Sequence, residues 1–154
     1  YPTPPVAAFT RLAADAHNAY VAEVRHPVEV PASDQDQLVK WLSKRLDEQV
    51  RVPALARVGY EFLGGRLLPA DGGVAAQLMY QNTAGSRVTL YFKRGDRDGN
   101  TAFRYVVEEG LSVFYWRDGD VAYALSSELP REALLVVRNE VYSQLDPGAG
   151  PAGW

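Results

Sequence analysis

The spacing of apolar residues changes from helical to alternating near Tyr60 and returns to helical near Pro130. Apolar residues recur at helical steps over residues 6–23, 33–49 and 130–145, which predicts three helices. Between them, runs that alternate apolar and polar residues are separated by glycine, asparagine and aspartate, as is typical of strands joined by short turns. Because the strands form one block, we expect an α+β domain. Its antiparallel meander sheet would have about five or six strands, with two N-terminal helices and one C-terminal helix covering one face.

The alternating block divides into strand segments at 60–68, 75–81, 87–94, 101–108, 111–117 and 120–126. Gly64-Gly65 interrupts the first segment and indicates either a bulge or a turn. Asp118-Gly119 predicts the turn of the last hairpin. Before the second helix, Ser33 is followed by acidic residues, so we expect its hydroxyl to cap that helix.

The composition is that of one globular domain. The chain has 154 residues, 47% hydrophobic and 23% charged, and no cysteine. The formal net charge of -3 and the scattered lysines and arginines argue against nucleic-acid binding. No apolar run reaches the ~18 residues of a membrane span. We expect a proline-rich leader at 1–5, one domain at 6–145 and a flexible tail at 146–154.

The polar residues form no pattern that predicts catalysis or metal binding. His17 lies in the middle of a predicted helix and His26 precedes a proline. Two imidazoles without cysteines or a pattern of acids make a weak metal site. Glu108-Glu109 falls at a predicted turn, and no serine lies in a nucleophile elbow. We therefore expect no enzyme, no cofactor and no metal.

Aromatic residues are dense on the predicted strands and lie on both strand faces. Alternation puts Phe114 and Trp116 on one face and Tyr115 on the other. If helices cover only one face, the aromatic residues of the other face meet solvent or a partner. In the alternative interpretation they pair across strands and stabilise the sheet. Tyr115 and Trp116 are accordingly candidates for a partner surface.

The segment at 26–31, His-Pro-Val-Glu-Val-Pro, carries prolines near both ends and predicts an edge strand or a pinned loop. An edge strand offers unpaired backbone groups to an incoming chain. His26, Val28 and Val30 therefore join the candidate partner surface.

Several segments, taken in order, resemble the region after the membrane helix in proteobacterial transmembrane anti-sigma factors, also called transmembrane transcriptional regulators. The likeness covers about residues 8–145 and lies in the order of the motifs rather than in any one of them. The segments are residues 24–30, 38–46, 64–69, 75–80, 90–91, 114–116, 123–126 and 128–129.

The resemblance implies a periplasmic sensory domain that follows a single inner-membrane helix. It further implies that a cytoplasmic segment before that helix, outside this chain, binds an extracytoplasmic-function (ECF) sigma factor. No catalytic residues belong to this region of the family. A periplasmic protein or a protease is the expected partner on the outer side. The main rival interpretation is a periplasmic module that binds a small apolar ligand between the sheet and the helices. A hydrolase is the third.

Overall fold

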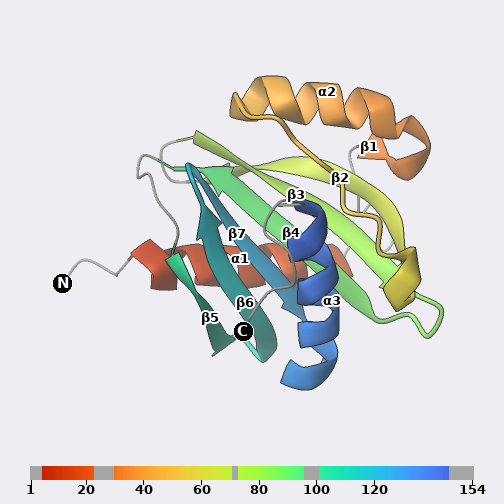
Figure 1. Cartoon of the computed structure of the whole chain (residues 1–154), viewed down its shortest axis with the longest axis vertical. Helices are drawn as coiled ribbons and strands as arrows, with labels where there is room; N and C mark the ends of the chain where they lie inside the picture. Colours follow the sequence, from red (N-terminus) through yellow and green to blue (C-terminus); the bar gives the residue numbers. More distant parts are fainter. Residues whose placement is uncertain (1–4, 23–29, 71–72, 96–100, 146–154) are drawn as a thin grey trace.

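The computed structural model describes residues 5–22, 30–70, 73–95 and 101–145. They form an α+β domain in which one antiparallel sheet carries helices on both faces (Figure 1). The helices are α1 (Pro5–Ala22), α2 (Gln35–Leu46) and α3 (Arg131–Leu145), with 3-10 turns at Ala32–Asp34 and Ala56–Val58. The strands are β1 (Val30–Pro31), β2 (Tyr60–Ala70), β3 (Gly73–Asn82), β4 (Arg87–Arg94), β5 (Thr101–Glu108), β6 (Leu111–Asp118) and β7 (Val121–Ser127).

The predicted tail, and the predicted leader apart from Pro5, lie outside the described residues. Within the described ranges, no helix has the length and apolar character needed to cross a membrane.

The spatial order of the strands is β1-β2-β3-β4-β7-β6-β5, which corrects the predicted simple meander. Strands β2, β3 and β4 follow one another as antiparallel neighbours. The chain then crosses to the far edge, where β5 lies, and returns through β6 to β7. Strand β7 pairs with β4, from Val88 opposite Ser127 to Arg94 opposite Val121. The last strand of the chain, β7, therefore lies in the interior of the sheet, between β4 and β6.

Strand β2 has a bulge at Leu63, directly before the glycine pair, and the strand continues through it. The register with β3 shifts between Phe62 and Gly64, after which pairing continues to Ala70. A Cβ on Gly65 would lie 3.1 Å from methyl groups of both Leu38 and Leu78, so the absence of a side chain lets α2 approach the sheet. Of the two predicted alternatives, bulge or turn, the structure has the bulge.

Two local predictions were wrong in detail. Helix α2 begins at Gln35 after the 3-10 turn, and its N-cap is Asp34, which makes no side-chain capping hydrogen bond. Ser33 lies inside that 3-10 turn and is not the cap. In the last hairpin Asp118 pairs with Val121, so the two turn residues are Gly119 and Asp120.

The main core lies between the sheet and the pair α2 and α3. Leu38 and Leu42 of α2, and Leu134 and Val141 of α3, are fully buried there. The sheet supplies the alternate residues that point to this face, which are Ala76, Leu78, Tyr80, Val88, Leu90, Phe92, Phe114, Trp116 and Leu125. Burial of so many large apolar side chains is the main source of the stability of the domain.

Helix α1 covers the opposite face, which corrects the prediction that all helices lie on one face (Figure 1). Its contact residues are small: Ala13, Ala14 and Ala16 pack against sheet residues such as Ala75 and Ala124. Small side chains let the helix lie close to the strands, and they leave room for large rings at one end. Phe9 fills that end, with ring centroids 5.1 Å from Tyr91 and 5.7 Å from Tyr115.

Candidate functional site

The most distinctive polar arrangement lies where the end of α2, the end of β4, the turn between β6 and β7, and the end of α3 meet. A pocket of about 270 Å³ opens there, and we call it the Arg94 pocket. Its lining consists of Leu46, Glu48, Gln49, Val50, Arg51, Phe92, Arg94, Asp118, Gly119, Asp120, Val121, Tyr123 and Leu145.

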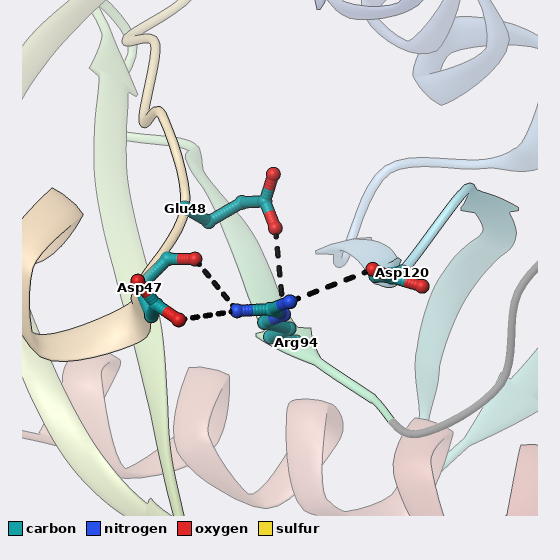
Figure 2. A network of polar contacts seen from close by, with 4 residues as sticks. All are labelled: Asp47, Glu48, Arg94 and Asp120. Atoms are coloured by element: carbon teal, nitrogen blue, oxygen red, sulfur yellow. Dashed lines mark hydrogen bonds and ion pairs between the residues drawn. The ribbon is translucent and has the colours of Figure 1, made fainter.

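Arg94 ties three elements together at the rim of this pocket. Figure 2 shows its guanidinium between the carboxyl groups of Asp47, Glu48 and Asp120. Its Nη1 atom lies 2.6 Å from Asp47 Oδ2 and donates to the Asp47 carbonyl at 2.9 Å. Glu48 Oε2 lies 3.7 Å from Nε, and Asp120 Oδ2 lies 3.6 Å from Nη2. The hydrogen bond to Asp47 and the three negative charges raise the pKa of Arg94.

The local backbone explains why these groups meet. Asp47 ends α2 in the left-handed conformation, with φ of 53°, which turns both its carbonyl and its carboxylate toward β4. Arg94 is the last residue of β4. Asp120 lies in the two-residue turn before β7, and its carbonyl accepts a 2.6 Å hydrogen bond from the amide of Gly95. The pairing of β4 with β7 thus brings the turn to the arginine.

The floor of the Arg94 pocket is apolar and aromatic. The rings of Phe92 and Tyr123 lie side by side with centroids 5.7 Å apart, and Tyr123 stacks on Trp116 at 5.3 Å. Burial raises the pKa of Tyr123 to about 12, and the nearby charges of Asp118 and Glu48 act in the same direction. The phenol therefore stays protonated at neutral pH and can donate a hydrogen bond. An apolar floor under a charged rim suits a small amphipathic molecule or a side chain of a partner.

A second pocket has a volume of about 440 Å³. It is lined by Gln35, residues 52–56 and residues 59–62. The lining is mostly apolar and holds only one ionisable carboxylate, that of Glu61. It lacks converging polar groups, so we place the candidate site at the Arg94 pocket.

A polar cluster is buried between α1 and the sheet. His17 is fully buried, and its Nδ1 atom lies 2.9 Å from Thr89 Oγ1. Burial, and secondarily the charge of Arg87, lowers the pKa of His17 to about 4. Arg66 donates from Nε to Gln77 Oε1 at 2.6 Å and from Nη2 to the carbonyl of Ala16 at 3.3 Å. These contacts fix α1 on the sheet. Within the described ranges, no group of three or more histidine or acidic side chains is arranged to hold a metal ion.

A buried arginine, Arg138, lies on the opposite face of the sheet, where α3 packs. Arg138 of α3 has no exposed surface, and its guanidinium lies 4.9 Å from the ring centre of Phe103 and 5.4 Å from that of Phe114. Its Nη2 donates to Asn139 Oδ1 at 2.6 Å. Burial lowers the pKa of Arg138 to about 9. The stacked rings and the adjacent amide favour a structural role for this cation.

Two residues of the predicted partner surface, Tyr115 and Trp116, are buried in the structure. Tyr115 and Trp116 are only 5% and 1% exposed, because α1 covers one of them and α3 with the main core covers the other. Neither residue therefore contributes to an exposed aromatic face. Val30 lies in β1, where it pairs with Gly65 at the edge of the sheet. His26 and Val28 lie outside the described residues.

Sequence reasoning missed the Arg94 pocket. Its charged residues come from three parts of the chain that are far apart in sequence: the segment after α2, the end of β4 and the turn between β6 and β7. The available signal was that charges directly follow the last apolar positions of three elements. That signal becomes informative only once the pairing of β4 with β7 is known.

Comparison of the chain with family models, with curated proteins and with solved structures gave no match.

Proposed function

We propose that this domain is the extracytoplasmic sensory domain of a membrane anti-sigma factor that controls an ECF sigma factor. The observation that carries the proposal is the packing of the segments that bear the family resemblance. Residues 38–46 form most of α2, residues 64–69 follow the bulge of β2, and residues 75–80 lie in β3. They meet where Gly65 contacts Leu38 and Leu78. Because these three segments pack against one another, each restricts which residues the other two can carry. Such mutual restriction is expected of motifs that occur together in the proteins of one fold.

The proposed function needs recognition and no chemistry. The lining of the Arg94 pocket contains no histidine, serine, threonine or lysine, and two of its three carboxylates, those of Glu48 and Asp120, are paired with Arg94. Both faces of the sheet are covered by helices, so recognition falls to the strand edges and to the pocket. A partner on the periplasmic side of the inner membrane would bias one state of the domain. A membrane helix outside this chain would carry that bias to the segment that holds the sigma factor.

The experiment uses the full gene product. Alkaline phosphatase fused after Trp154 should be active, and a green fluorescent protein fusion at the same point should be dark, as for a periplasmic domain. Deletion of residues 8–145 should change transcription from a promoter of the bound sigma factor, while membrane insertion stays intact. A cytoplasmic fusion pattern, a cleaved signal peptide before Tyr1, or unchanged transcription would each contradict the proposal.

A periplasmic module for small ligands is the second candidate, and the Arg94 pocket is the observation that favours it. The space between sheet and helices is filled by core residues, so the site lies at the end of the sheet instead. Three carboxylates and two guanidiniums line the pocket above Phe92 and Tyr123. This excess of negative charge suits a small molecule with an aromatic body and an ammonium group.

The test is a titration with phenethylamine followed by NMR shifts of the chain, with phenylacetate as the matched anion. Phenethylamine should shift resonances of the pocket, and Asp118→Asn should weaken that binding. Equal effects of the two compounds, or none, would count against a ligand site here.

A further inference from the structure

Strand β5 forms one outer edge of the sheet. It pairs with β6 on one side, and in the part of the chain that the structure describes no strand pairs with its other side. The opposite edge carries the two-residue strand β1, a bulge and Pro69, and all three oppose strand addition. The backbone donors and acceptors of β5 are therefore the more accessible edge for another strand.

The side chains of β5 divide between the two faces. Arg104, Val106 and Glu108 point to the α1 side, as do their neighbours Tyr115, Val113 and Leu111 in β6. Tyr105 and Val107 point to the side of α3. Val107 is 66% exposed. In Figure 1, α3 lies beside β6 and does not extend past the outer edge of β5. An exposed valine on an open strand edge marks a surface that another strand can cover.

The charges of β5 select one way for the strand to pair with a copy of itself. The register with β6 shifts between Thr101 and Arg104, so the regular part of β5 is residues 104–108. An antiparallel pair with its twofold axis at Val106 puts Arg104 opposite Glu108 of the second copy, and this happens twice. An axis at Arg104 would oppose two like charges, and an axis at Tyr105 would set Arg104 against Val106.

We propose that β5 is a dimerisation edge, at which two copies of this chain join their sheets in antiparallel register with Val106 on the twofold axis. On the α1 side the two Arg104–Glu108 pairs flank the two Val106 side chains. On the other side each Val107 packs against Tyr105 of the second copy, so its exposed surface is covered. The contact comprises five residue pairs, so the dimer is weak and depends on concentration. The inference concerns the chain itself and does not depend on the proposed function.

The first experiment uses single cysteines, because the chain has none of its own. Under the proposed register, two Val106→Cys residues face each other at about 4.5–5.5 Å between Cα atoms, within the range for a disulfide. Two Val107→Cys residues are offset and lie about 7–8 Å apart, beyond that range. Mild oxidation should therefore cross-link Val106→Cys faster, although Val107 is the more exposed position. Equal or faster cross-linking of Val107→Cys, or no cross-linking of either variant, would overturn the proposal.

The second experiment exchanges charges and reads association by sedimentation velocity over increasing protein concentration. Arg104→Glu alone and Glu108→Arg alone should each self-associate less than wild type, because each opposes like charges across the interface. An equimolar mixture of the two variants should associate again, because both cross-pairs become opposite in sign. Glu132→Arg, an exposed charge on α3, is the matched control and should leave association unchanged. If the mixture does not associate while each variant keeps its far-UV circular dichroism, the register is wrong.

Discussion

The buried histidine beneath α1 makes the stability of the domain depend on pH. The pKa of His17 is lowered to about 4 in the folded chain, against an ordinary value of 6.5. Because the unfolded chain binds the proton more tightly, acid favours unfolding. The contribution is fully present above pH 6.5 and is lost as the pH falls toward 4. The free energy of unfolding should drop, relative to neutral pH, by about 2 kcal/mol at pH 5 and by about 3 kcal/mol at pH 4 from this residue alone.

The assay compares urea unfolding of wild type and His17→Asn between pH 4 and 7.5. Asparagine keeps a polar atom near the position of Nδ1, which contacts Thr89, but it does not titrate in this range. The stability difference between the two proteins should therefore shrink by the amounts given above as the pH falls. The chain has two histidines, so in a His26→Asn background NMR reads the pKa of His17 directly. A stability difference that is constant over this pH range, or a measured pKa near 6.5, would refute the reasoning.

Three further substitutions test the packing. Leu42→Ala should lower the free energy of unfolding by about 2–5 kcal/mol, since the side chain is fully buried. Val136→Ala, on the exposed side of α3, is the control and should cost less than about 0.5 kcal/mol. A loss below about 0.5 kcal/mol for Leu42→Ala would mean that this face of α2 is not part of the core. Gly65→Ala should cost about 1–3 kcal/mol, because its Cβ would crowd two leucine methyl groups at 3.1 Å, and a neutral result in thermal melts would show that they move aside. Tyr80→Phe should cost about 1–3 kcal/mol in denaturant melts, because the buried hydroxyl donates to the Pro53 carbonyl at 2.8 Å; unchanged stability would contradict that hydrogen bond.

Local patterns in the sequence predicted the elements well. Strands β4 and β5 have the predicted bounds, and the sequence also indicated that Gly64-Gly65 disturbs its strand. These features depend on residues close together in the chain, where alternation and glycine leave a direct mark. The capping of α2 was wrong because a 3-10 turn precedes the helix and moves its start by two residues past Ser33.

The arrangement of the elements could not be predicted in the same way. Nothing in β4 or β7 specifies that they pair, since an alternating strand suits any neighbour. The cover of the second face was missed because the contact residues of α1 are alanines, which give a weak apolar stripe. The aromatic residues on both strand faces were the correct signal that both faces are buried, and Tyr115 and Trp116 illustrate it. The Arg94 pocket depends on the same long-range pairing and was therefore equally out of reach.

The position of β7 has a consequence for the synthesis of the chain. Strand β4 is complete at Arg94, but the strand that covers its second edge begins only at Val121. At a synthesis rate of about 5–20 residues per second, roughly 2–7 s pass before β7 has left the ribosome. During that time the backbone edge that will become the middle of the sheet is open, and its side chains include Leu90 and Phe92. The nascent chain is therefore most prone to aggregate after residue 94 and before residue 127 has been made, and a chain truncated between these residues should fail to fold even though it contains α1, α2 and at least four strands.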